Sequence, residues 1–257
     1  MGESPPSDGR APDVDVVILT WNDGELLATA VDSALHSEDV GVAVVVVDNG
    51  SDPPAAVPQP GVELVRSETN LGVAPGRNLG AAKGSAPFLC LLDSDAELSP
   101  RSLRALLDAH DDPTVGVSVP VFRDQAPEAS GGVAPTFSVK LARGLGLRST
   151  YRSAARDQEA HVWDVDFGIG ACQVIRRSVF DEVGGLDGSI FYGPEDVDFC
   201  LRVRAAGHRV VQVAGADVRH PPRRAFRQPF TRRGLQHGVA ILRHLWRHRG
   251  GRNAAKG

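Results

Sequence analysis

The sequence predicts a single α/β domain in which helices cover both faces of a mostly parallel central sheet. Short apolar runs rich in Val, Ile and Leu alternate along the chain with segments of helical periodicity. The runs are continuously apolar, which is typical of strands buried on both faces. The 257 residues, 42% of them hydrophobic, are enough to bury one substantial core.

The first half of the chain contains four apolar runs that predict buried strands. They span residues 15–20, 42–47, 62–65 and 88–92. Leucine and alanine recur at helical spacing after the first run, which predicts a helix over 25–37. A second helix is expected over 74–83, where Pro75 suits a first helical turn. The order strand, helix, strand, loop, strand indicates a mostly parallel sheet.

The second half is less regular. A helix is expected over 101–110, capped by Ser99 with Pro100 at its first position, and then a strand over 115–119. Residues 123–160 are rich in Gly, Pro, Ser and Arg without a firm period, so we expect low order or a substrate-facing lid there. The remaining expected features are an ordered stretch over 162–174, a short helix through Val179, a turn at Gly184 and Gly185, a helix beginning near Pro194 and a strand over 209–213.

Charge and composition divide the chain into three parts. Residues 1–12 are polar and Pro-rich and predict a flexible lead-in, and residues 13–222 form the predicted domain. The net charge is -4, yet residues 219–257 hold eleven Arg or Lys and no acidic residue. We expect a basic amphipathic helix and tail over 223–257.

Within 231–248, the residues Leu235, Val239, Leu242 and Trp246 form an apolar helical stripe among arginines. We expect this stripe to dock on the main domain or on a second subunit, as in a homodimer. Peripheral contact with an anionic membrane surface is the alternative. Nucleic-acid binding is not expected, because the tail lacks interleaved aromatic residues beyond Trp246 and the rest of the chain is acidic.

The cysteines and the hydropathy indicate a cytoplasmic protein. Cys90, Cys172 and Cys200 form no Cys-x-x-Cys pair and are expected to be reduced core residues. No run approaches the roughly 20 apolar residues of a membrane-spanning helix, and no apolar signal-peptide core begins the chain. If the tail binds lipid, the expected location is the inner face of the membrane.

Acidic residues follow the fourth predicted strand as Asp93-Ser94-Asp95. In open α/β sheets the ligand crevice lies at the carboxyl ends of the strands. Two carboxylates there supply the oxygen ligands that Mg²⁺ or Mn²⁺ prefers, and such an ion can bridge a diphosphate. An ordinary polar turn is the alternative.

Three further motifs have both a ligand-binding and a structural interpretation. Asp48-Asn49-Gly50-Ser51 ends a strand and could bind a nucleobase or ribose, or form a turn. In the segment 70–78, glycines allow close backbone approach and Arg77 suits a phosphate, although a solvated arginine is equally compatible. The segment 193–198 places three carboxylates in a first helical turn, where they can complement the helix dipole or accept a proton from an acceptor hydroxyl.

Taken in order, these motifs resemble the inverting family-2 glycosyltransferases of the GT-A fold, especially the bacterial rhamnosyltransferase-like branch. The resemblance covers about residues 13–220 and rests on six segments. They are Val17-Ile18-Leu19-Thr20-Trp21-Asn22, Val47-Asp48-Asn49-Gly50-Ser51, Asn70-Leu71-Gly72-Val73-Ala74 with Gly76-Arg77-Asn78, Leu91-Leu92-Asp93-Ser94-Asp95, Gly170-Ala171-Cys172-Gln173-Val174-Ile175-Arg176-Arg177, and 193–202 beginning Gly193-Pro194-Glu195-Asp196.

The resemblance implies a metal-dependent, hexosyltransferase-type enzyme that uses a nucleoside-diphosphate-sugar and inverts the anomeric centre in one displacement. The implied donor-nucleotide residues are Thr20, Asn22, Asp48, Asn49, Asn70, Gly72, Arg77 and Asp93. The implied metal ligands for Mg²⁺ or Mn²⁺ are Asp95, Asp93 and His220. Asp196 is implied as catalytic base with Glu195 as the fallback, and Gly170 and Ala171 would line the acceptor side. A glycan, a lipid-linked acceptor or a small molecule remains open as acceptor.

Other functions fit the sequence less well. A catalytically silent module that binds nucleotide-sugar or a membrane surface would not need the intact Asp93, Asp95 and Asp196. A sugar-phosphate nucleotidyltransferase would need a Gly-rich signature near the first strand. The chain also lacks a Gly-x-Gly-x-x-Gly fingerprint after that strand and a Gly-Lys-Ser/Thr phosphate loop.

Overall fold

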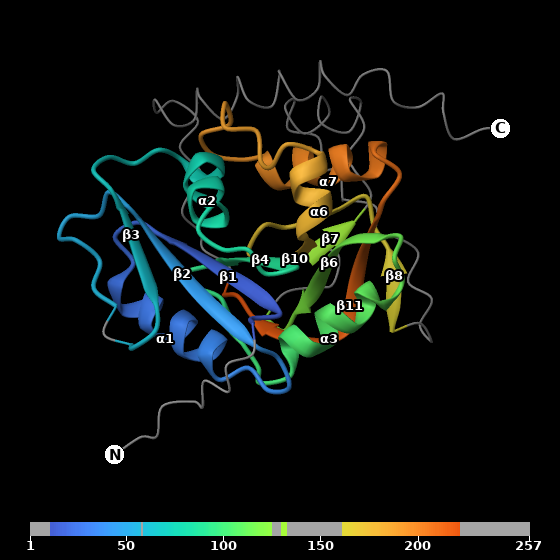
Figure 1. Ribbon diagram of the computed structural model, residues 1–257, viewed down its shortest axis with the longest axis horizontal. Helices are drawn as coiled ribbons and strands as arrows, with labels where there is room; N and C mark the ends of the chain where they lie inside the picture. The colour runs from blue at the N-terminus through green and yellow to red at the C-terminus, as the bar shows by residue number, and fades with distance from the viewer. Residues whose placement is uncertain (1–10, 58, 125–129, 133–160, 222–257) are drawn as a thin grey trace.

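A computed structural model describes residues 11–57, 59–124, 130–132 and 161–221 (Figure 1). Within these ranges, nine strands form one sheet in the order β3-β2-β1-β4-β10-β6-β11-β5, with β8 paired to β11. Its strands are β1 (Val14–Thr20), β2 (Val42–Asn49), β3 (Glu63–Ser67), β4 (Phe88–Asp93), β5 (Glu97–Leu98), β6 (Val115–Phe122), β8 (Val162–Asp164), β10 (Cys172–Arg176) and β11 (Arg209–Arg219). A second, two-stranded sheet consists of β7 (Gly131–Gly132) and β9 (Phe167–Gly168).

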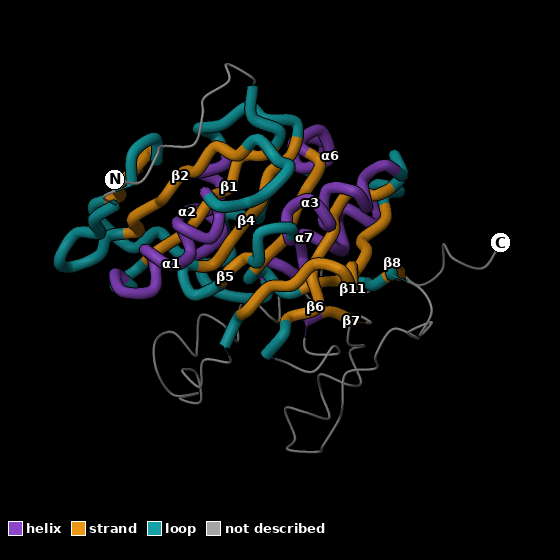
Figure 2. The backbone as a smooth tube through the Cα atoms, turned by 90° about the horizontal axis from the view of Figure 1, so that it is seen from below, coloured by secondary structure: helices purple, strands orange, loops and turns teal. Residues whose placement is uncertain are grey.

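The strands that form the middle of the large sheet run mostly parallel. β1 pairs in parallel with β2 and β4, β2 with β3, and β6 with β11. β10 lies between β4 and β6 and is antiparallel to both, so β4 and β6 point the same way. The mostly parallel sheet is therefore confirmed, and Figure 2 shows its strands running alongside one another from β2 to β11.

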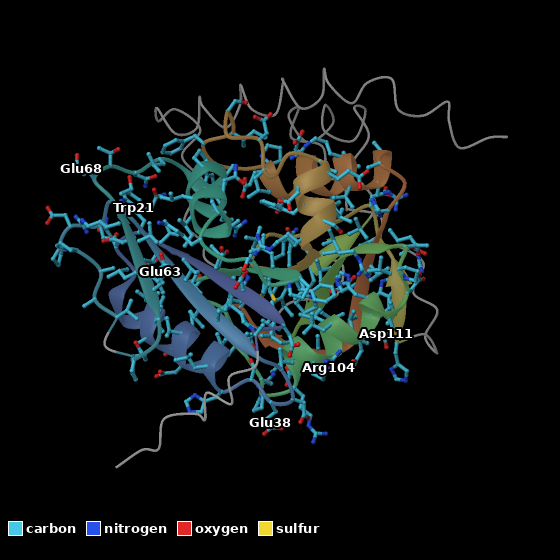
Figure 3. All side chains as sticks on the ribbon, viewed as in Figure 1. Trp21, Glu38, Glu63, Glu68, Arg104 and Asp111 are labelled. Carbon is cyan, nitrogen blue, oxygen red and sulfur yellow. The ribbon has the colours of Figure 1, made fainter. Side chains whose placement is uncertain are left out.

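Because the parallel strands share a direction, their carboxyl ends meet at one edge of the sheet. Trp21 follows β1 and Glu68 follows β3, and both lie toward the upper left of Figure 3. Glu38, which precedes β2, lies at the bottom of the same view. The predicted motifs after β1, β2 and β4 consequently lie on the same edge.

Helices cover both faces of the sheet, as predicted. They are α1 (Gly24–Leu35), α2 (Val73–Ala81), α3 (Ser102–Asp108), α6 (Arg177–Glu182) and α7 (Glu195–Ala205), with a 3-10 turn η1 (Ala109–Asp111) after α3. Buried residues of α1 and α3, such as Val31 and Leu106, share one core cluster with alternate strand residues such as Ile18. Residues of α2, α6 and α7 pack with the other strand face, which includes Val17, in a second cluster. Figure 1 shows α1 and α3 below the sheet and the other three above it.

Several boundaries differ from those predicted. The helix expected over 101–110 begins at Ser102, and its N-cap position is Arg101, without a side-chain cap. Ser99, the predicted cap, does not occupy the N-cap position. Its hydroxyl donates to Asp217 at 3.1 Å, and its carbonyl accepts from Ser102 N–H. β6 and β11 extend beyond the predicted ranges, to Phe122 and Arg219.

Three further predictions fall partly or wholly outside the described residues. They concern the lead-in 1–12, the segment 123–160 and the basic helix and tail 223–257. Among the helices that the structure does describe, none has the length and apolarity needed to cross a membrane.

Candidate active site

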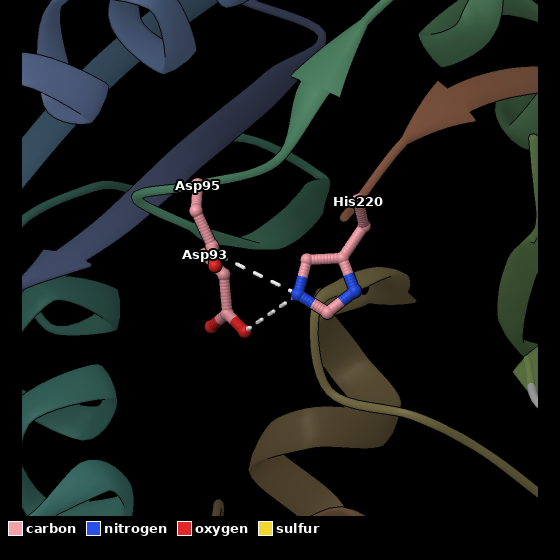
Figure 4. A group of neighbouring side chains, drawn as sticks. All are labelled: Asp93, Asp95 and His220. Atoms are coloured by element: carbon pink, nitrogen blue, oxygen red, sulfur yellow. Dashed lines mark ion pairs between the residues drawn. The ribbon is translucent and has the colours of Figure 1, made fainter. Parts of the chain in front are cut away.

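Three side chains that could hold a metal ion meet at the carboxyl-end edge of the sheet. Asp93 ends β4, Asp95 follows two residues later, and His220 comes directly after β11. Their ligand atoms all lie within 4.8 Å of one another. His220 Nε2 is 3.5 Å from Asp95 Oδ1 and 3.9 Å from Asp93 Oδ2 (Figure 4). The structure thus brings together the three residues predicted as metal ligands.

A short antiparallel pairing brings His220 to the two aspartates. β5 begins two residues after Asp95 and pairs with the end of β11, with Leu98 opposite Val218. The imidazole of His220 also packs against the ring of Phe122, with 5.3 Å between the ring centroids. No pattern in the sequence predicts β5, because it has only two residues.

The donor set fits a divalent cation. Carboxylate oxygens suit Mg²⁺ and Mn²⁺, and an imidazole nitrogen is a ligand that transition metals such as Mn²⁺ also accept. The side chains of Asp95 and His220 are 6% and 15% exposed, whereas that of Asp93 is 35% exposed. An ion bound here would therefore be held from the protein side by Asp95 and His220 and would be approached from the side of Asp93.

Arg77 is a buried cation that contacts this cluster through Asp93. Its Nη2 donates to Asp93 Oδ1 at 2.5 Å and to the carbonyl of Gly170 at 2.7 Å. Its Nη1 is 3.8 Å from Glu195 Oε1. Burial alone would lower the pKa of Arg77, but the negative charges of Asp93 and Glu195 raise it above the ordinary value. Arg77 thus joins the metal motif to the first turn of α7, and its contact with a donor nucleotide stays a prediction.

The first turn of α7 contains two carboxylates with raised pKa values. Burial is the largest cause in both, and it raises the pKa of Glu195 to about 7 with a further contribution from the charge of Asp196. Burial also raises the pKa of Asp196, against the opposing effect of the Val197 and Gly170 N–H groups and the charge of Arg77, which stabilise its ionised form. Two adjacent groups with perturbed pKa values are typical of acid–base sites.

The segment before β10 connects these two carboxylates to the metal motif. Gly170 N–H donates to Asp196 Oδ2 at 3.0 Å, and the carbonyl of Ala171 accepts from Asp93 N–H at 2.9 Å. A Cβ at Gly170 would lie 2.6 Å from Nη1 of Arg77, so a larger residue would displace the arginine. Gly170 and Ala171 therefore lie between the predicted base and the predicted metal ligands, and their contact with an acceptor stays a prediction.

The loops after β1 and β2 form the predicted nucleoside side. Thr20 is buried and its Oγ1 has no hydrogen-bond partner among the described residues. Asn22 adopts a φ of 60° and its N–H donates to Ser51 Oγ at 2.9 Å. Asp48 accepts from Ser51 N–H at 2.9 Å and forms an ion pair with Arg66. Thr20 at the end of β1, Asn22 in the loop that follows and Asp48 near the end of β2 thus lie in connected segments, although much of the hydrogen-bonding capacity of Asp48 is used within the protein.

Hydrogen bonds link the predicted donor residue Asn49, at the end of β2, to the predicted donor residues Asn70 and Gly72, which precede α2. Asn49 Nδ2 donates to Asn70 Oδ1 at 3.2 Å and to the carbonyl of Gly72 at 3.1 Å. Asn49 Oδ1 accepts from Leu71 N–H at 2.9 Å. The side chains of Asn49 and Asn70 hold the backbone at the entry into α2. We therefore expect the donor to contact this segment mainly through backbone atoms.

Sequence reasoning assigned no role to two residues near the site. Ser94, between the two aspartates, donates its hydroxyl to Asp23 Oδ2 at 3.0 Å. The pKa of Tyr192 is raised, first by burial and then by the charges of Glu195 and Asp93. An aromatic residue three positions before the acidic pair could have been noted as a candidate, whereas the partnership of Asp23 with Ser94 depends on the fold.

Comparison with known proteins identifies the family. Residues 15–184 match the family described as Glycosyl transferase family 2. The N-acetylglucosaminyl-diphospho-decaprenol L-rhamnosyltransferase of Mycobacterium tuberculosis is 32% identical over 231 residues, covering 80% of this chain and 75% of the relative. The pre-mycofactocin glycosyltransferase of the same organism is 31% identical over 244 residues, covering 92% of this chain and 48% of the relative.

Solved structures support the same fold. GalNAc-T7, crystallised with UDP, GalNAc and Mn²⁺, has a TM-score of 0.71 at 19% identity, covering 93% of this chain and 48% of that chain. The mannosyltransferase PcManGT from Pyrobaculum calidifontis, in complex with GDP-Man and Mn²⁺, has a TM-score of 0.62 at 19% identity, covering 94% of this chain and 67% of that chain. The chain described here belongs to glycosyl transferase family 2 and is a glycosyltransferase with the GT-A fold.

Proposed function

We propose that the chain transfers a sugar from a nucleoside-diphosphate-sugar to an acceptor hydroxyl in one displacement that inverts the anomeric centre. One observation carries the proposal: Asp93, Asp95 and His220, which could hold a cation, are joined through Arg77 to Glu195, and through Arg77 and Gly170 to Asp196. A site for stabilising negative charge and a site for accepting a proton therefore share one edge of the sheet.

Departure of a nucleoside diphosphate from a sugar builds negative charge on the leaving oxygens and positive character on the sugar, as in glycoside hydrolysis. Mg²⁺ or Mn²⁺ held by Asp93, Asp95 and His220 would supply Lewis-acid stabilisation of the leaving diphosphate. Arg77 holds Asp93 by a 2.5 Å contact, which fixes the orientation of that carboxylate before donor binds.

Asp196 is the proposed base. Its Oδ2 is oriented by Gly170 N–H at 3.0 Å and its Oδ1 by Val197 N–H at 2.7 Å. An oriented carboxylate with a raised pKa can take the proton of an acceptor hydroxyl as that oxygen attacks the anomeric carbon. Glu195 is the fallback, because its Oε2 is buried without a hydrogen-bond partner among the described residues. The displacement needs no covalent intermediate on the enzyme.

The donor nucleoside is proposed to bind beside Thr20, Asn22 and Asp48, with the diphosphate toward Asp93. The GDP-Man and UDP of the structural neighbours support a nucleoside-diphosphate donor. The name of the rhamnosyltransferase relative favours a lipid-linked acceptor over a free glycan or a small molecule. Such an acceptor would suit a cytoplasmic enzyme that meets the inner face of the membrane through residues 231–248.

A thermal-shift experiment with Asp95→Asn tests the metal assignment. We expect Mn²⁺ together with UDP, GDP or their sugar conjugates to raise the melting temperature of the wild-type protein, because a ligand that binds only the folded state stabilises it. Asp95→Asn removes a buried carboxylate ligand and should lose the part of the shift that requires Mn²⁺.

Glu97→Gln is the matched control. Glu97 is an exposed carboxylate two residues away that pairs with Arg219 at 3.4 Å, outside the cluster. This variant should keep the Mn²⁺-dependent shift. A full Mn²⁺-dependent shift in Asp95→Asn would rule out Asp95 as a metal ligand.

A further inference from the structure

The side chain of Asp23 does not cap α1, although the position of Asp23 in the chain would predict this role. Asp23 occupies the N-cap position of α1, where an aspartate usually accepts a hydrogen bond from the first turn of its helix. Here the N-cap makes no such side-chain bond. Oδ2 of Asp23 instead accepts the hydroxyl of Ser94 at 3.0 Å, across 71 positions of sequence.

Ser94 is the residue between the two predicted metal-ligating aspartates. It is 4% exposed, and the turn that contains it is closed by a bond of 3.0 Å from Ala96 N–H to the carbonyl of Asp93. Any rotation of the backbone at Ser94 would therefore move the carboxylates of both Asp93 and Asp95.

The residue before Asp23 is anchored on the opposite side. Asn22 is held at a φ of 60°, in the left-handed region that asparagine tolerates better than most residues. Its N–H donates to Ser51 Oγ at 2.9 Å, and its Oδ1 accepts from Asp52 N–H at 2.9 Å. The loop after β1 is thus tied to the end of β2 through Asn22 and to the metal motif through Asp23.

We propose that Asp23 and Ser94 are positioning residues that hold Asp93 and Asp95 in place for the cation and align the metal end of the site with its nucleoside end. The inference rests on the proposed function, since it assigns the pair to the same cation site. The physical reason is general: residues that orient metal ligands through hydrogen bonds contribute to affinity without touching the ion, and losing them typically costs about 10- to 100-fold.

Hydrogen exchange of the metal-free protein tests the positioning directly. We expect amides of the segment 94–98 to exchange about tenfold faster in Ser94→Ala and in Asp23→Ala than in the wild-type protein, because local opening becomes easier when the bond is lost. Asp23→Asn keeps a side-chain oxygen that can accept the hydroxyl of Ser94, so it should exchange at close to the wild-type rate.

Titration with Mn²⁺ alone, followed by the loss of the free-ion electron paramagnetic resonance signal, tests the consequence for the site. We expect about tenfold weaker Mn²⁺ binding in Ser94→Ala and Asp23→Ala. The double variant should be no weaker than either single variant, because both remove the same bond. Asp23→Asn should bind close to normally.

Ser99→Ala is the matched control, since it also removes a serine–aspartate hydrogen bond between distant segments, that of Ser99 with Asp217 at 3.1 Å. It should change neither exchange over 94–98 nor Mn²⁺ affinity. Wild-type exchange or wild-type Mn²⁺ affinity in both alanine variants would overturn this inference alone. Failure of the wild-type protein to bind Mn²⁺ alone would also overturn this inference, whereas failure to bind Mn²⁺ with UDP or GDP present would overturn the metal part of the proposed function.

Discussion

At the scale of single residues, three carboxylates around one buried guanidinium set the chemistry of the site. Arg77 touches Asp93 directly and lies 3.8 Å from Glu195, while Asp196 is held by the N–H of Gly170, whose carbonyl binds Arg77. Burial favours the protonated form of Glu195 and Asp196, whereas the positive charge of Arg77 favours the ionised form, and the net effect is a raised pKa for both carboxyls.

These raised pKa values predict a pH dependence of turnover. The pKa of Glu195 is raised to about 7 and that of Asp196 is raised above its ordinary value, so kcat/KM should rise with pH across the range in which this coupled pair ionises. The sign follows because the base must be ionised to accept a proton. The measurement is kcat/KM between pH 5 and pH 9 at fixed Mn²⁺.

Two variants assign the base. Asp196→Asn should lower kcat by roughly 10²- to 10⁴-fold with donor binding nearly intact. Glu195→Gln should instead keep most of the turnover and move the midpoint of the pH profile, because it removes a neighbouring charge. Unchanged turnover in Asp196→Asn would pass the role to Glu195.

At the scale of elements, the entry into α2 depends on a glycine. Gly72 has a φ of +94°, and a Cβ there would lie 2.6 Å from the carbonyl oxygen of Phe191. That same carbonyl accepts from Val73 N–H at 2.7 Å, so the loop before α7 is fastened to the start of α2. An added Cβ at Gly72 would therefore meet a backbone atom of Phe191, which cannot move aside as a flexible side chain would.

We therefore expect Gly72→Ala to destabilise the protein by more than the roughly 1–3 kcal/mol that backbone strain alone costs. Gly207→Ala is the control, since Gly207 has a nearly identical φ of +95°, yet no atom of the described residues lies within 4 Å of an added Cβ. Urea denaturation of both variants measures the difference. Equal losses would mean that the Phe191 contact relaxes without cost.

At the scale of the whole molecule, an ion pair at the amino end of β1 joins the two halves of the sheet. Asp15 Oδ2 pairs with Arg177 at 2.6 Å and accepts from Ala86 N–H at 2.8 Å. Arg177 also donates to the carbonyls of Ala81 and Ala86. This junction lies at the edge of the sheet opposite the site, so its role is structural.

Asp15→Ala should lower the free energy of unfolding by about 3–5 kcal/mol, because it leaves a mostly buried guanidinium without its charge partner. Glu63→Ala should cost less than about 1 kcal/mol, since Glu63 and Lys83 form an exposed pair at 3.8 Å. Chemical denaturation of the two variants compares them. A similar loss in both would contradict the structural role of the Asp15 pair.

The sequence by itself determined the α/β class, most strand and helix positions and the motifs at the strand ends. These follow from local periodicity, and parallel strands place their carboxyl ends together whatever the details of packing. The acidic motifs at Asp93 and Asp196 are therefore recognisable from residue order alone.

Only the tertiary structure decided how these motifs meet. β10 is antiparallel and starts beside the end of β4, which brings Gly170 to Arg77, and the two-residue β5 pairs with β11, which brings His220 to Asp95. Such contacts join segments far apart in the chain, and their strength comes from burial and pairing that no local pattern encodes. The sequence therefore shows each candidate ligand within its own motif, but only the folded sheet brings Asp93, Asp95 and His220 together.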